Sequence, residues 1–244
     1  MKLGIMQPYF FPYIGYWQLM NAVDIYVIYD DVNYIKGGWI NRNRILVNGN
    51  PNYFNVQLKD ASPYKKINEI EVNNDEISKR KMITSIELNY KKAPFFNDAF
   101  PIIKDIILQD ERNLAKYLIY SIKKIAQYLD INTKFIVSSE LEKNNELKGK
   151  EKVLSICKLL GASEYYNAIG GQELYDYDSF AKNDIVLNFV QTNDIKYKQF
   201  KNEFVPNLSI IDAMMFNSKD DVKKFLLNYE LINDTEKVKK IWKK

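Results

Sequence analysis

Histidine is absent from the whole sequence of 244 residues. This excludes serine–histidine and cysteine–histidine triads, histidine-ligated metals and imidazole acid–base chemistry. Any proton transfer therefore falls to Asp, Glu, Lys, Tyr or the substrate itself. Cys157 is the single cysteine and lies in the apolar helical pattern of residues 153–160. We expect it to be a buried small hydrophobic side chain rather than a nucleophile or a metal ligand.

Long apolar runs are missing as well. No stretch approaches the roughly eighteen consecutive apolar residues of a membrane span, and residues 1–4 lack the apolar region of a signal peptide. We therefore expect a cytoplasmic protein in a reducing environment, with no membrane span.

The charge is close to balanced, with 35 Lys and Arg against 31 Asp and Glu. These charges alternate along the predicted helices instead of forming a block, so we predict no nucleic-acid partner. The most basic stretch, residues 237–244, is interpreted as a solvated tail. A small phosphorylated substrate remains compatible, because a few well-placed cations suffice to bind it.

Alternating strand and helix patterns indicate the fold. Residues 3–6 and 25–29 are predicted strands around a helix at 14–22, entered through Pro12. The alternation resumes with strands at 135–137, 164–167 and 186–190 and helices at 150–160 and 173–181. This order predicts an α/β protein with a Rossmann-like, doubly wound and mainly parallel sheet.

Two excursions interrupt this alternation. Residues 40–47 and 52–58 flank Asn48-Gly49, which predicts a β-hairpin. A helical insert is predicted at approximately 75–130, in three pieces at 77–89, 97–108 and 111–129, and two further helices at 210–216 and 222–228. No repeat, low-complexity tract or linker is visible, so we expect a single domain over residues 1–244.

The turn after the first strand is the first candidate site. In a Rossmann-like sheet this turn brings phosphates to the N–H groups of a helix N-terminus. Pro12-Tyr13-Ile14-Gly15-Tyr16 resembles the His-x-Gly-His signature of nucleotidyltransferases and adenylate-forming ligases such as pantothenate synthetase, with Tyr13 and Tyr16 in place of the histidines. Tyrosine donates a hydrogen bond but carries no positive charge near neutral pH. The alternative is that Gly15 only permits a close helix–strand approach and the tyrosines pack.

The second candidate site follows the second strand at Asp30-Asp31. These carboxylates are suited to hold Mg²⁺ or to fix a sugar hydroxyl. The next segment supplies cations, amides and an aromatic ring: Lys36, Trp39, Asn41, Arg42 and Arg44. The cations are suited to neutralise a diphosphate, and Trp39 offers a stacking face. The alternative is a salt-bridged loop in which Asp30 and Asp31 pair with Arg42 and Arg44.

A third candidate site combines Asn167, Gly170, Gly171 and Glu173 at another turn from strand to helix. Its glycines are suited to expose N–H groups to an anion, and the turn is expected at the same sheet edge as the first two.

Asp212 lies in an apolar run, so we expect it to be buried with a partner. Pairing with Arg42 or Arg44 and a catalytic role are the two interpretations.

Four segments resemble the WbqC-like family over nearly the whole chain: residues 6–16, 29–44, 167–175 and 209–212. The resemblance implies a role in bacterial O-antigen or other surface-polysaccharide biosynthesis, often beside enzymes that make amino-deoxy sugars. It also implies a substrate that carries a nucleotide diphosphate.

Our main hypothesis is an enzyme that transfers an acyl or aminoacyl group to the amine of a nucleotide-linked amino sugar. Its candidate residues divide by role: Asp30 or Asp31 accepts a proton, Lys36, Arg42 and Arg44 neutralise phosphate, and Gln7, Tyr9 and Asn41 orient the substrate. If the likeness to adenylate-forming enzymes extends to the reaction, ATP with Mg²⁺ activates the acyl group; otherwise another acyl donor is required.

Two alternatives remain. A glycosyltransferase would use Asp30-Asp31 to hold a metal and a nucleotide sugar. A non-catalytic binding or scaffolding protein of polysaccharide assembly would expose the aromatics between Tyr9 and Tyr16.

Overall fold

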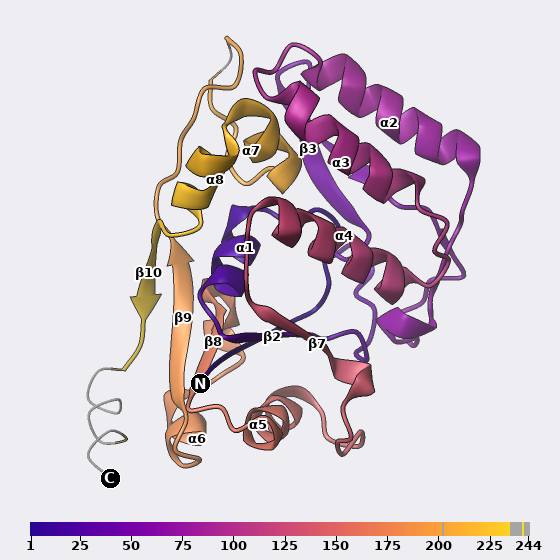
Figure 1. Cartoon of the computed structure of the whole chain (residues 1–244). Coiled ribbons are helices and arrows are strands. Elements are labelled where there is room, and N and C mark those ends of the chain that lie inside the picture. The colour runs from indigo at the N-terminus through magenta and orange to yellow at the C-terminus, as the bar shows by residue number, and fades with distance from the viewer. Residues whose placement is uncertain (202, 235–240, 242–244) are drawn as a thin grey trace.

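The computed structural model describes residues 1–201, 203–234 and 241, so most of the basic stretch 237–244 lies outside the described residues. Its centre is a six-stranded sheet in the order β10-β9-β8-β1-β2-β7 (Figure 1). Five strands are parallel: β1 (Lys2–Met6), β2 (Ile25–Ile28), β7 (Lys134–Val137), β8 (Glu164–Ala168) and β9 (Val186–Thr192). β10 (Tyr229–Ile232) pairs antiparallel with β9 at one edge.

Helices cover both faces of this sheet (Figure 1). Leu3 and Ile5 of β1 pack toward α5 (Gly149–Leu159) and α6 (Tyr177–Ala181), in one hydrophobic cluster. Tyr26 and Ile28 of β2 belong to a second cluster, with α1 (Ile14–Asn21) and α4 (Leu114–Tyr128). Side chains alternate between faces because the strand repeat is two residues. The predicted doubly wound α/β fold is therefore confirmed.

The predicted burial of Cys157 is also confirmed. Its side chain is fully buried within α5, and burial raises the pKa of its thiol to about 12.

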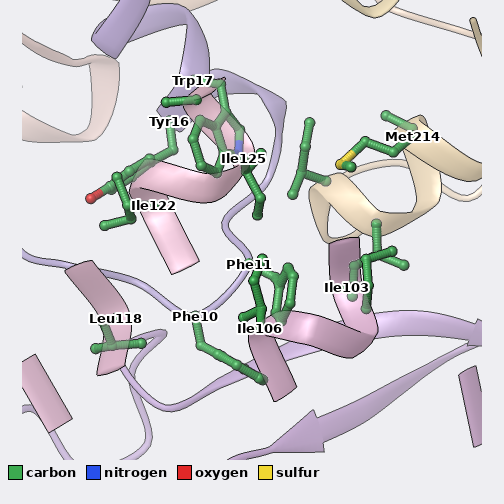
Figure 2. Packing of buried hydrophobic residues seen from close by; sticks show 14 of the residues in the cluster. Phe10, Phe11, Tyr16, Trp17, Ile103, Ile106, Leu118, Ile122, Ile125 and Met214 are labelled. Carbon is green, nitrogen blue, oxygen red and sulfur yellow. The ribbon is translucent and has the colours of Figure 1, made fainter. Parts of the chain in front are cut away.

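The insert forms the three predicted helices, α2 (Glu76–Tyr90), α3 (Phe96–Leu108) and α4. Asp75 caps α2 by accepting from the backbone N–H groups of Ile77 and Ser78. Figure 2 shows how the insert joins the core: Ile103, Ile106, Leu118, Ile122 and Ile125 pack in one cluster with Phe10, Phe11, Tyr16, Trp17 and Met214. Met214 belongs to α7 (Ile210–Phe216).

Because this cluster is shared, we infer that sheet and insert form a single domain. Tryptophan fluorescence and far-UV circular dichroism should then follow one coincident unfolding transition, and two separated transitions would contradict the inference.

The predicted hairpin is formed by β3 (Arg42–Val47) and β4 (Asn50–Asn55). Asn48 and Gly49 have φ of 50° and 80°. Two successive positive φ angles match the twist of a two-residue hairpin turn, which explains the Asn-Gly pair.

Several elements differ from the sequence predictions. Residues 169–173 form a 3-10 turn, and α6 begins only at Tyr177, where the Asp176 side chain caps it. α8 (Lys219–Phe225) ends before residue 228, and β10 begins at Tyr229. A short ribbon of β5 (Leu58–Lys59) and β6 (Glu71–Val72) was also not predicted. Within the described ranges, no helix has the length and apolar character needed to cross a membrane.

Candidate functional site

The chain reverses its direction of travel across the sheet between β1 and β8. It runs from β1 to β2 and β7 on one side, and later adds β8 and β9 on the other (Figure 1). In open α/β sheets such a switch point opens a ligand crevice beyond the carboxyl ends of the strands. Two adjoining pockets occupy this position, and both are lined by Tyr9, Tyr13 and Trp39.

The first, which we call the tyrosine pocket, has a volume of about 440 Å³. None of its lining residues is charged. The other polar and aromatic residues that line it are Gln7, Tyr16, Tyr29, Asn167 and Tyr175, together with Gly170 and Gly171. Three apolar side chains at its border are exposed to solvent: Ile35, Trp39 and Leu174.

The second, the arginine pocket, has a volume of about 430 Å³. Arg44 is the charged residue in its lining. The other residues specific to this pocket are Pro12, Asn43, Ile169, Gln191, Thr192 and Asn207. The carboxyl end of β9 thus closes a crevice that begins at the turn after β1.

The turn after β1 is strained and held in place by buried donors. Phe11 has φ of 43°, the left-handed region that a bulky side chain rarely adopts. Asn43 donates its Nδ2 to the carbonyls of Phe10 and Phe11 at 3.1 and 2.9 Å, and Ser209 Oγ donates to Phe11 O at 2.8 Å. Trp17 Nε1 donates to Pro12 O at 3.0 Å. A strained residue persists where its surroundings determine it in this way, and the turn places Tyr9 and Tyr13 on either side.

Gly15 is required by a close approach. A Cβ at this position would lie 2.5 Å from the Tyr13 ring and 2.7 Å from Thr192 Oγ1. Tyr16 is fully buried and donates to Gln7 O at 3.0 Å. The packing interpretation of this motif thus applies to Gly15 and to the buried side chain of Tyr16, which also lines the tyrosine pocket, whereas Tyr13 borders both pockets.

The tyrosines of the crevice are neutral hydrogen-bonding groups at physiological pH. Burial raises the pKa of Tyr9, Tyr13 and Tyr16, and the neighbouring Tyr13 raises the pKa of Tyr9 further. None of them can supply a phenolate near neutral pH.

The two arginines of β3 have different environments. Arg44 Cζ lies 5.6 Å from the centre of the Trp39 ring, at the arginine pocket. Arg42 donates to the carbonyls of Gly37 and Gly38, and its Cζ lies 4.6 Å from the Tyr53 ring. Arg42 lines neither pocket.

Lys36 and Asn41 also lie outside both linings. Lys36 is exposed, whereas Asn41 accepts from Tyr34 Oη at 2.8 Å and donates to Val56 O at 3.0 Å.

Asp30 and Asp31 form a closed corner after β2. Asp30 accepts from the backbone N–H and the hydroxyl of Ser139 at 2.9 and 2.6 Å. Asp31 Oδ2 pairs with Lys152 at 2.9 Å and with Lys143 at 3.0 Å, and all three side chains are buried. Burial alone would raise the pKa of Asp31, but hydrogen bonds and charge from the lysines outweigh it and lower the pKa to about 2.

These contacts test the alternative that Asp30 and Asp31 form salt bridges with the arginines of β3. The partners of the two carboxylates are Ser139 and the lysines, so the alternative in which they pair with Arg42 and Arg44 is wrong. Both carboxylates lie outside the pocket linings. Asp31 Oδ2 holds both lysines, whereas its Oδ1 is buried without a hydrogen-bond partner among the described residues. No group of three or more metal-ligating side chains occurs in the part of the chain that the structure describes. A catalytic role for Asp30 or Asp31 stays a prediction.

The third segment contributes Asn167, Gly170 and Gly171 to the tyrosine pocket, whereas Glu173 is exposed outside its lining. A Cβ on Gly171 would lie 3.0 Å from the Asn167 side chain, while Gly170 has open space beside it. The structure therefore brings all three predicted segments together through some of their residues. Sequence reasoning missed Gln191, Thr192 and Asn207, although the end of the predicted strand at 186–190 pointed toward the first two.

Asp212 is fully buried, as expected, but its predicted pairing with an arginine is wrong. Its carboxylate accepts from Tyr90 Oη at 2.9 Å, Tyr197 Oη at 2.7 Å and Gln199 Nε2 at 2.6 Å. Burial raises the pKa of Asp212. It lines neither pocket, and it ties α7 to α2 through these bonds.

An open, mainly parallel sheet with a crevice at its switch point is the architecture of Rossmann-like ligand-binding proteins. Residues 7–224 match the family model described as the WbqC-like protein family, and the chain belongs to this family. It is similar to the "Uncharacterized protein Rv1507c" of Mycobacterium tuberculosis, with 28% identity over 220 residues, covering 88% of this chain and 93% of that protein. No solved structure gives a significant match.

Proposed function

We propose that this protein is an enzyme of bacterial surface-polysaccharide biosynthesis that transfers an acyl or aminoacyl group to the amine of a nucleotide-linked amino sugar. The family membership supports the biosynthetic context. The observation that carries the proposal is the two-pocket crevice at the switch point, because a transferase must hold a donor and an acceptor side by side.

The lining of the crevice suits a sugar nucleotide. Tyr9, Tyr13 and Trp39 present aromatic surface where the pockets meet, and such rings stack against bases and the apolar faces of sugars. Gln7 and Gln191 add amide groups that can bond to hydroxyls. Apolar walls with a few polar groups are typical of small-molecule sites.

The chemistry requires little from the protein. The neutral sugar amine attacks the acyl carbon of a thioester or an acyl adenylate, a C–N bond forms, and the bond to the leaving group breaks. The amine proton leaves with the thiolate or phosphate, so the atoms balance without an enzyme-bound intermediate. Neither pocket is lined by cysteine or serine, and the Thr192 hydroxyl already donates to Gln18 Oε1 at 2.7 Å. Positioning of the two substrates is then the main contribution to rate.

The two alternatives have less support. A metal-dependent glycosyltransferase needs carboxylates at its ligand crevice, whereas Asp30 and Asp31 lie outside both pocket linings and bond to Ser139 and two lysines. A scaffold would display the aromatics of the opening motif, but Phe10, Phe11 and Tyr16 are buried.

Mass spectrometry tests the proposal. The purified protein is incubated with UDP- or dTDP-linked amino sugars and either acyl-coenzyme A or ATP, Mg²⁺ and an amino acid. We expect the nucleotide sugar to gain the mass of one acyl group, with no gain for the matching sugar that carries a hydroxyl in place of the amine. Failure of the whole panel to bind in a thermal-shift assay, where a ligand at a hundred times its Kd stabilises by about 2.7 kcal/mol, would contradict the proposal.

A further inference from the structure

Arg44 is a charged side chain without a compensating charge. It forms no ion pair with any Asp or Glu in residues 1–201, 203–234 and 241, and its Nε is buried without a hydrogen-bond partner there. Its Nη2 makes one hydrogen bond, to Asn207 O at 3.3 Å. A guanidinium carries five N–H donors, and leaving buried donors unpaired is unfavourable. An anion in the arginine pocket would supply the acceptor that these donors lack.

Arg42 shows what a structural arginine looks like on the same strand. It lies two residues earlier on β3, yet its Nε and Nη2 are engaged with backbone carbonyls and its guanidinium lies against Tyr53. Both arginines share the strand and an aromatic neighbour. Only Arg44 combines unpaired donors with a pocket.

Other donors surround the same space. Tyr9, Tyr13 and Gln191 line the arginine pocket, and their side-chain polar groups have no hydrogen-bond partner in the described part of the chain. The N-terminal turn of α1 begins beside them at Ile14, with no side chain capping it. Hydroxyl, amide and guanidinium donors together are the usual partners of phosphate oxygens.

The neighbouring pocket has the opposite character. No charged side chain lines the tyrosine pocket, and its border carries exposed Ile35 and Leu174. An anion placed there would lose hydration without gaining a cation, which is unfavourable. A ligand that spans both pockets is therefore oriented by its charge.

We propose that the arginine pocket is an anion subsite for a phosphate or diphosphate group, with Arg44 as its cation, and that the uncharged part of the same ligand lies past Trp39 in the tyrosine pocket. This inference rests on the proposed function for its choice of a nucleotide-linked ligand. The subsite itself requires only an anion.

Isothermal titration calorimetry with inorganic diphosphate, UDP and uridine tests the subsite on the wild type, Arg44→Gln and Arg42→Gln. We expect Arg44→Gln to weaken binding of diphosphate and UDP by about ten- to a hundredfold, since a hydrogen bond to a charged group contributes roughly 1.5–3 kcal/mol. Uridine should bind both arginine variants as it binds the wild type. Arg42→Gln should keep diphosphate affinity within about threefold, and circular dichroism confirms that each variant is folded.

Three results would overturn the subsite: unchanged UDP affinity in Arg44→Gln, an equal loss in Arg42→Gln, or an equal loss for uridine. The last would mean that Arg44 stacks on the base instead of binding the anion. The proposed function fails separately. If Arg44→Gln loses diphosphate and UDP but the wild type acylates no amino sugar, the subsite stands and the acyltransferase proposal falls. If amino sugars are acylated with an unchanged KM in Arg44→Gln, the reverse holds.

Discussion

The corners that follow β1 and β2 lie at the carboxyl ends of neighbouring parallel strands, and both are rich in polar groups. After β1, the backbone carbonyls of Phe10 and Phe11 accept hydrogen bonds from the side chains of Asn43 and Ser209. The side chains of Tyr9 and Tyr13 line the pockets. After β2, Asp30 is bonded to Ser139, and Oδ2 of Asp31 pairs with Lys143 and Lys152, while Oδ1 of Asp31 is buried without a hydrogen-bond partner among the described residues.

A corner that is rich in polar side chains is therefore not necessarily one whose side chains can reach a ligand. A ligand site needs side chains whose own partners are missing, while the backbone that carries them is fixed by others. The β1 corner has this division of roles and its tyrosines line the pockets, whereas the carboxylates of the β2 corner lie outside both linings in a buried ion-pair cluster. The predictions below test whether the division holds.

The largest effect is expected at the β2 corner. Asp31→Asn leaves Lys143 and Lys152 buried without an anion, and removing one partner of a buried ion pair typically destabilises by about 3–5 kcal/mol. Urea unfolding monitored by circular dichroism measures the change. If the variant is as stable as the wild type but inactive, Asp31 has the predicted catalytic role, and the structural role assigned to the β2 corner is wrong.

The β1 corner should respond through its backbone. Asn43→Ala removes the donor to two buried carbonyls, for which we expect a loss of about 2–3 kcal/mol in the free energy of unfolding. Asn41→Ala is the control, because the Asn41 amide bonds to Val56 O and lies outside the turn. Because Asn41 also makes hydrogen bonds, we expect a smaller loss for Asn41→Ala, and an equal loss would contradict the greater contribution assigned to Asn43.

Acid should weaken the β2 corner. The pKa of Asp31 lies at about 2 in the folded protein, below its ordinary value of 3.8. A lowered pKa stabilises the fold above pH 3.8, and this stability is lost as the pH falls toward 2; the contribution is about 2 kcal/mol. Unfolding free energies measured at pH 5, 4 and 3 should fall less steeply for Asp31→Asn than for the wild type. Parallel curves would contradict the assignment.

The smallest effect on stability is expected where the crevice is exposed. Trp39 is 38% exposed, so Trp39→Ala should change the unfolding free energy by less than about 1 kcal/mol. Loss of an aromatic stacking face should nevertheless weaken UDP-sugar binding about tenfold. Tyr53→Ala is the control, since Tyr53 stacks on Trp39 with ring centres 6.2 Å apart but lines neither pocket. If Trp39→Ala and Tyr53→Ala lose the same affinity, the binding site includes the hairpin strand β4 that carries Tyr53.

The fold was largely predictable because its signals are local. Asn48-Gly49 determines the hairpin turn, and the spacing of Leu118, Ile122 and Ile125 identifies α4. β10 was not predicted because a strand of four residues so close to the end of a helix forms only through its pairing with β9.

The site was predictable only in part. Sequence placed Arg42 and Arg44 together, but which of them is engaged depends on the carbonyls of Gly37 and Gly38 and on the Tyr53 ring. Likewise, the lysines that pair with Asp31 lie more than a hundred residues away along the chain, at 143 and 152. Such long-range pairings follow from tertiary structure and leave no local pattern.

The hydrogen bond from Ser209 Oγ to Phe11 O affects the order in which parts of the protein fold during synthesis. The opening motif leaves the ribosome long before α7, because a donor to its left-handed residue Phe11 lies 198 residues further along the chain. A nascent chain that ends before α7 lacks this bond and the Ile210 N–H that bonds to Pro12 O. Ligand binding should therefore be among the last properties to appear during synthesis, long after the first strand and helix have been made.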